Sequence, residues 1–175
     1  MHEAAHVVVA LHLGLKLLRV SIVDADGGAT TSFDEAEFQT REPALCEKYI
    51  VMAFAGFAME RLRGYAVEWS NVEYGSDRRS VEMFQKNSRI DDANLPRLRA
   101  EAERLVATPL IRYAIYTAAI ELRTWGWRTC SEWLVRDSLR RAPDQTLIRR
   151  LRRWDRKFRV DPLQSLIFLV GLRHR

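Results

Sequence analysis

Three residues at the start of the chain have the types and the spacing for metal-dependent chemistry. The segment HEAAH at residues 2–6 is an H-E-x-x-H motif. On a helix, His2 and His6 lie one turn apart on the same face, so both imidazoles can reach one Zn²⁺ at about 2.0–2.1 Å. Glu3 is then placed to take a proton from a metal-bound water that attacks a carbonyl. Because buried imidazoles and carboxylates are costly without partners, a metal also explains their presence in the apolar segment HEAAHVVVALH.

A zinc hydrolase needs a third protein ligand, and His12 has the spacing for it in the metzincin pattern H-E-x-x-H-x-x-G-x-x-H. In this chain Val9 replaces the glycine that lets the backbone turn away from the helix. On a continuous helix, His12 lies about 9 Å beyond His6 and roughly 240° around the axis. We therefore expect His12 to be a peripheral helix residue and not a ligand.

Short elements must position these residues. The first helix is expected to stop at Gly14, the second helix to begin at Pro43 and stop at Gly64, and Ser76 to cap the third. Apolar periodicity predicts helices over residues 2–14, 43–63, 77–88, 95–106, 109–123 and 129–142, and strands over residues 17–23 and 29–33. The predicted fold is mostly α with a small N-terminal β-sheet (α+β), in a domain over residues 1–142 followed by a basic helical extension over residues 143–175.

The composition is that of a globular protein, with 47% hydrophobic and 29% charged residues among 175. The longest apolar run near the C-terminus, LIFLVGL, is far shorter than the roughly 20 residues of a membrane span, and no signal peptide is recognised. Two cysteines make no disulfide framework. We expect a bacterial cytoplasmic protein without a transmembrane segment.

The net charge of +5 comes mainly from arginines, which concentrate in RRLRRWDRKFR at residues 149–159. Such a run can mark nucleic acid or an anionic surface, but it is also common as a solvated helix face. No nucleic-acid-binding signature accompanies it, so a nucleic-acid partner is not expected.

Several segments, in order, resemble the peptidase domain of the FtsH family of AAA+ zinc proteases. They are the zinc helix HEAAHVVVALHL, the strand LRVSIV, the glycine turn GGAT, the helix segment AFAGFAMERL and the segment YGSDRRS. The resemblance covers about residues 2–140 and implies a zincin-like, FtsH-type helical bundle. Carried over by position, the resemblance implies that zinc is bound by three ligands: His2, His6 and Asp77. It also implies that Glu3 is the general base. Glu73 and Glu60 remain alternative third ligands, and Glu60 could instead orient an imidazole.

The function implied is that of a zinc metallo-endopeptidase acting on unfolded or extended polypeptides. The family's peptidase domains assemble as hexameric rings, so the resemblance implies a homo-oligomer. These 175 residues contain no Walker-type phosphate loop, so ATP-driven unfolding would need a separate ATPase partner. The family continues the zinc helix upstream of Met1, which leaves either a truncated chain or weakened metal binding. The alternative function is a weakly active or inactive relative that acts as a binding module through residues 149–159.

Overall fold

The structure is a computed structural model that describes residues 1–23, 28–33, 39–70 and 75–124. The chain separates into two units, Met1–Ala142 and Pro143–Arg175, and every described residue belongs to the first. The predicted helix over residues 129–142, the arginine-rich segment 149–159 and the predicted basic extension lie outside the described residues. They stay predictions.

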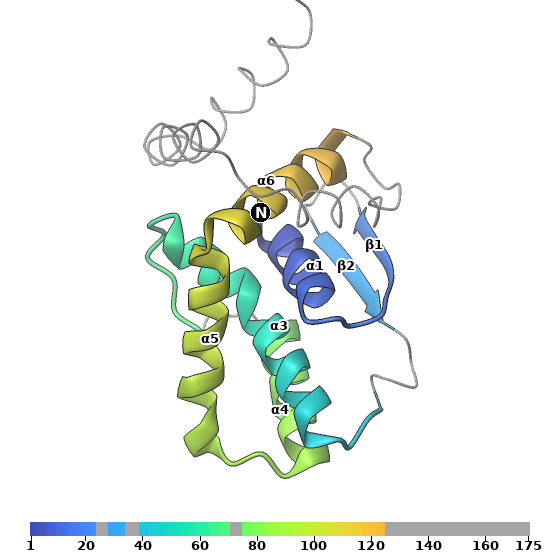
Figure 1. Cartoon of the computed structure of the whole chain (residues 1–175), viewed down its shortest axis with the longest axis vertical. Coiled ribbons are helices and arrows are strands. Elements are labelled where there is room, and N and C mark those ends of the chain that lie inside the picture. The colour runs from blue at the N-terminus through green and yellow to red at the C-terminus, as the bar shows by residue number, and fades with distance from the viewer. Residues whose placement is uncertain (24–27, 34–38, 71–74, 125–175) are drawn as a thin grey trace, which may run out of the picture. The chain divides into compact units, whose positions relative to one another are not determined.

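Helices dominate the part of the chain that the structure describes (Figure 1). The elements are α1 (His2–His12), β1 (Leu17–Val23), β2 (Gly28–Phe33), α3 (Pro43–Leu62), α4 (Gly75–Ser88), the short 3₁₀ helix η2 (Asp92–Asn94), α5 (Leu95–Ala107) and α6 (Pro109–Thr124). The predicted helices within these ranges are all present, with small differences at their ends. The largest are two residues: α1 ends at His12 and not at residue 14, and α4 begins at Gly75, so Ser76 lies inside the helix and does not cap it as predicted.

Glycines end the two helices that matter most for the site. After α1, the amide of Leu13 still donates to the carbonyl of Val9 at 2.9 Å, and Gly14 then adopts a φ of +77°. Gly64 follows α3 with a φ of +86°. Because this left-handed region is strained for residues with a Cβ, glycine stops the helix there at little cost. Both predicted stops are confirmed.

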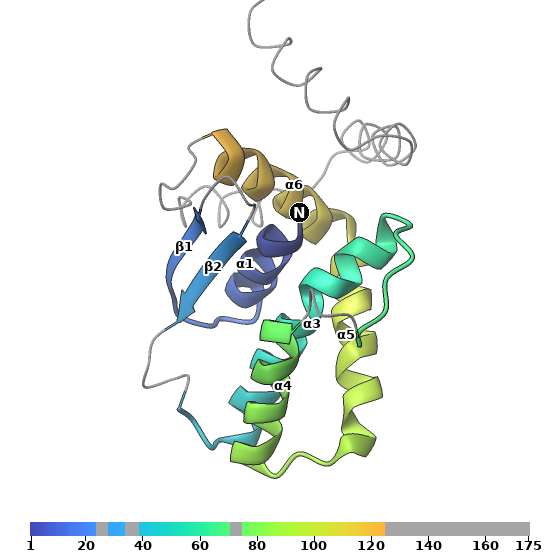
Figure 2. The same ribbon diagram turned by 180° about the vertical axis from the view of Figure 1, so that it is seen from behind.

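The centre of the fold is α3, which is apolar around its whole circumference. Its residues from Tyr49 to Met59 are all buried, as expected of a helix that is enclosed by other elements. It packs against α1, α4 and α5, and both views of the ribbon show these neighbours around it (Figures 1 and 2). Although α3 has 20 residues, no helix among the described residues combines the length and apolar character needed to cross a membrane.

The predicted fold class requires correction. Within the described residues, β1 and β2 pair only with each other, antiparallel, from Leu17 opposite Phe33 to Val23 opposite Gly28. A single hairpin of this kind cannot form a layer of its own, and the core is built by helix packing on helix. The two predicted strands form this hairpin, and the described part is mostly α, as predicted. The α+β fold class and the zincin-like architecture are wrong.

Candidate metal centre

His6 is the most deeply placed of the predicted ligands, with only 4% of its surface exposed on α1. Its Nδ1 lies 2.8 Å from the backbone carbonyl of Met52 on α3. Because a carbonyl oxygen only accepts, Nδ1 must carry the hydrogen, and in the neutral ring Nε2 then carries a lone pair. Among the residues that the structure describes, this buried Nε2 has no hydrogen-bond partner, and it lies 3.4 Å from Oδ2 of Asp77. A lone pair facing a carboxylate is repulsive, so this position favours a cation between the two atoms.

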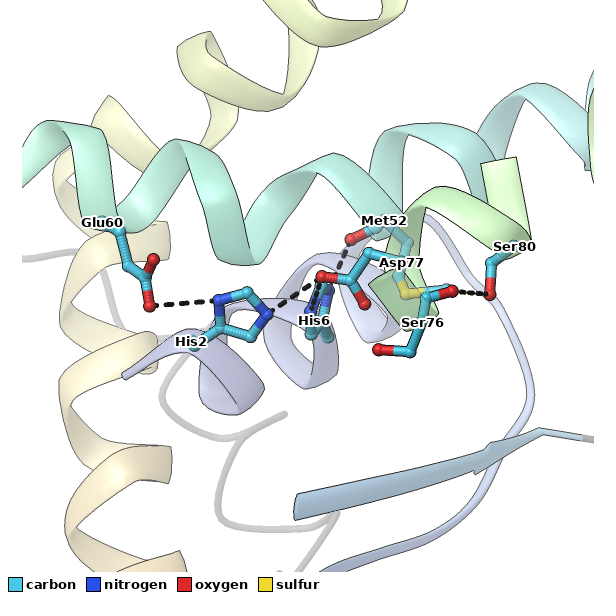
Figure 3. A network of polar contacts seen from close by, with 7 residues as sticks. All are labelled: His2, His6, Met52, Glu60, Ser76, Asp77 and Ser80. Atoms are coloured by element: carbon cyan, nitrogen blue, oxygen red, sulfur yellow. Dashed lines mark hydrogen bonds and ion pairs between the residues drawn. The ribbon is translucent and has the colours of Figure 1, made fainter. Parts of the chain in front are cut away.

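His2 lies one turn earlier on α1 and faces carboxylates with both ring nitrogens. Nδ1 is 3.2 Å from Oε1 of Glu60, and Nε2 is 3.0 Å from Oδ2 of Asp77. Figure 3 shows the ring held between these two side chains. Its plane stands nearly perpendicular to that of His6, with ring centroids 4.7 Å apart. The Nε2 atoms of both histidines therefore approach the same carboxylate oxygen.

These contacts shift the ionisation of His2 and Asp77 in opposite directions. Burial alone would lower the pKa of His2, but hydrogen bonds to Asp77 and Glu60 outweigh it and raise the pKa to about 9. Burial would likewise raise the pKa of Asp77, yet the hydrogen bond from His2 and the positive charge of that ring hold this pKa well below its usual range. Without a metal, a protonated His2 thus bridges two carboxylates. The proton on its Nε2 lies where a metal ion would bind.

Asp77 comes from α4, a different element from the histidines. It lies in the first turn of that helix, where the helix dipole favours a negative charge. The helix is attached through its two buried residues, Val81 and Phe84, and the Phe84 ring stacks on Tyr49 of α3 at a centroid distance of 4.7 Å. This packing brings the Asp77 carboxylate over the histidine face of α1.

Three of the predicted site residues therefore converge. One ligand atom each from His2, His6 and Asp77 lies within 4.8 Å of the others, and this group could hold a metal ion. Two imidazoles and one carboxylate suit zinc and other divalent first-row metals, so the donor set alone does not select zinc. Both imidazoles use Nδ1 to bind an acceptor outside the group, which is the usual support for a metal-ligating histidine.

The remaining predicted residues lie around this group. Glu60 contacts Nδ1 of His2, away from the three ligand atoms, as expected of a residue that orients the imidazole. Glu3 is half-buried beside His2, and its charge contributes to the raised pKa of that histidine. His12 is exposed at the end of α1, in agreement with its predicted peripheral role. Glu73 lies outside the described residues.

Sequence reasoning missed two contributions from α3. The carbonyl of Met52 fixes the His6 tautomer, and a backbone acceptor leaves no signal in the sequence. Gly56 lies against the His2 ring; its signal was a glycine inside a helix of otherwise buried apolar residues, a position where glycine is disfavoured.

Comparison of the chain with protein-family models, with curated proteins and with solved structures found no match.

Proposed function

We propose that the chain is a zinc-dependent metallopeptidase that hydrolyses peptide bonds in unfolded or extended polypeptides. The observation that carries the proposal is the buried Nε2 of His6, which has no hydrogen-bond partner within the described part of the chain and is directed at a carboxylate shared with His2. The tautomer set by Met52 makes this nitrogen a lone-pair donor, as a metal ligand must be. The order of motifs that resembles the FtsH family supports the same reading, and that family assignment remains a prediction.

Each residue of the site has one proposed role in metal binding or proton transfer. His2, His6 and Asp77 would hold the ion through two nitrogens and one oxygen, which leaves a coordination position for water or substrate. When bound, zinc lowers the pKa of water and polarises a carbonyl oxygen. Glu3 would accept the proton of the attacking water and deliver it to the leaving amine. Glu60 would hold the His2 ring in the orientation that points Nε2 at the ion.

Zinc is proposed because the H-E-x-x-H motif pairs two imidazoles with a general base, a combination suited to hydrolysis without redox chemistry. We propose that the substrates are unfolded or extended polypeptides, as the family resemblance implies. A homo-oligomer and a separate ATPase partner are part of the same proposal and rest on the family resemblance alone.

The test of this function is Glu3→Gln, the first of our predictions. The substitution should keep zinc stoichiometry and thermal stability while reducing cleavage of casein by at least about 10²-fold, the scale of a lost general base. Glu82→Gln is the matched control, because the Glu82 side chain is 65% exposed on α4 and should leave cleavage unchanged.

Two results would overturn the proposal. Equal casein cleavage by the wild type and Glu3→Gln would place the activity elsewhere or in a contaminant. A purified protein that neither retains nor takes up zinc, and does not cleave casein, would instead favour the binding-module function.

A further inference from the structure

One stripe on α3 faces His2 and His6 of α1. Met52, Gly56 and Glu60 are four residues apart, so they lie above one another along one face of the helix. The carbonyl of Met52 accepts from Nδ1 of His6, and the carboxylate of Glu60 lies at Nδ1 of His2. Gly56 sits between these two contacts. Two residues of α1 thus face three residues of α3. The middle residue of the three on α3 is a glycine and has no side chain.

The middle position is filled by the His2 ring. A Cβ added to Gly56 would lie 2.5 Å from Cε1 and Nε2 of His2 and 2.7 Å from Cδ2. All three nearest atoms belong to this ring, and each of these separations is far below van der Waals contact. One of the three is Nε2, which is also the atom directed at Asp77.

Backbone conformation does not explain the glycine. Among the described glycines, only Gly14 and Gly64 have a positive φ, so the backbone of Gly56 is one that any L-residue adopts. Glycine inside a helix is disfavoured relative to alanine, and α3 otherwise has buried alanines on either side, at Ala55 and Ala58. The requirement at position 56 is therefore space, the close approach for which glycine is used.

We propose that Gly56 is a positioning residue of the metal centre: it provides the slot that seats the His2 ring with Nε2 directed at the ion and Nδ1 at Glu60. This inference rests on the proposed metal site but does not require peptidase activity. The ring cannot move aside freely, because it is tied at both nitrogens, to Glu60 and to Asp77. A side chain at position 56 would therefore displace a ligand atom without removing any ligand.

The experiment compares Gly56→Ala with Gly75→Ala in the full chain. Gly75 is the matched control, because it lies on α4 two residues before Asp77 and an added Cβ there meets no described residue within 4 Å. Zn²⁺ affinity of Gly56→Ala should fall by at least tenfold, and up to roughly a hundredfold, the range seen when support of a ligand is lost. The visible spectrum of the Co²⁺-loaded protein should also change, since it reports ligand geometry. Gly75→Ala should match the wild type in both.

A second measurement removes the ring in the metal-free protein. Gly56→Ala should lower the melting temperature when His2 is present, and should leave it unchanged or raise it in a His2→Ala background. If Gly56→Ala lowers the melting temperature equally in the His2→Ala background, position 56 packs against another group. That result would overturn the inference. So would a Gly56→Ala protein with wild-type Zn²⁺ affinity and Co²⁺ spectrum. A wild type that binds neither ion would overturn the proposed function instead, while the metal-free comparison would still decide the role of Gly56.

Discussion

The metal centre joins two regions that are built differently. On α1, the eight consecutive residues from Ala4 to Leu11 are buried, and His2 and His6 are fixed to α3 by hydrogen bonds. On α4, only Val81 and Phe84 of 14 residues are buried, and the ligand Asp77 projects from the first turn. Two ligands therefore lie on a helix that is packed into the core, whereas the third comes from a helix with only two buried residues. The difference suggests that α4 is where the geometry of the site can adjust when an ion binds.

The largest effect is expected from removing the contribution of α4. Asp77→Asn keeps the shape of the side chain but loses the charge and the strong ligand oxygen. Zinc affinity should fall by more than the roughly 10–100-fold of a lost supporting residue, while α1 and α3 keep their packing. Calorimetric titration measures the loss and circular dichroism the fold. Asp92→Asn, an exposed aspartate of η2, is the control. Full zinc occupancy of Asp77→Asn would move the third ligand to another residue and end the comparison.

A proton competes with the metal on the α1 side. His2 has a pKa of about 9, and Nε2 must lose its proton to bind an ion. Zinc affinity should therefore rise about tenfold per pH unit, or about 10²-fold from pH 6 to pH 8, as one proton is displaced. Competition with a chelator of known pH dependence measures this slope. Affinity that is flat over this range would mean that His2 is already neutral, or is not a ligand.

The stability of the metal-free protein should change with pH in the opposite direction to its zinc affinity. A pKa raised from the ordinary 6.5 to about 9 gives stability that is complete below pH 6.5 and is lost as the pH rises through 9. Asp77, with its lowered pKa, gives stability that is present above its ordinary value and lost in acid. Thermal unfolding with and without zinc across this range separates the two behaviours.

The smallest effect is expected at the support from α3. Glu60→Gln should lower zinc affinity by roughly tenfold, because the glutamine oxygen still accepts from Nδ1 of His2 but without a charge. Glu60→Ala, which removes the acceptor, should approach a hundredfold. Titration of both variants under one condition gives the ratio. An alanine variant that binds zinc as tightly as the wild type would show that packing alone orients His2.

The sequence predicted the residues of the site better than it predicted the fold class. The four-residue spacing was enough to place His2 and His6 together, because helix periodicity is local. Asp77 was reached only through a resemblance, since no local pattern links it to α1. The bounds of α3, α5 and α6 followed from proline, glycine and apolar periodicity. The fold class failed because β-propensity marks short segments but does not count how many strands will pair into a layer.

The roles of α3 were beyond prediction for a different reason. Its apolar residues showed that it is buried, but not which of its faces meets α1. A backbone carbonyl at Met52 and an absent side chain at Gly56 act through position alone. Each depends on how two helices pack, which is decided by the whole core and not by the residues concerned.

The four-residue stripe on α3 has a consequence for how this chain can vary in length. A single residue inserted between Met52 and Glu60 would rotate everything beyond it by about 100° around the helix axis. The carboxylate would then turn away from His2 even though every residue type of the site was retained. Related sequences that keep the same metal centre should therefore accept many substitutions along α3 but no insertion or deletion within this interval, so an uninterrupted spacing from residue 52 to residue 60 is a more selective search criterion than the identity of the residues in between.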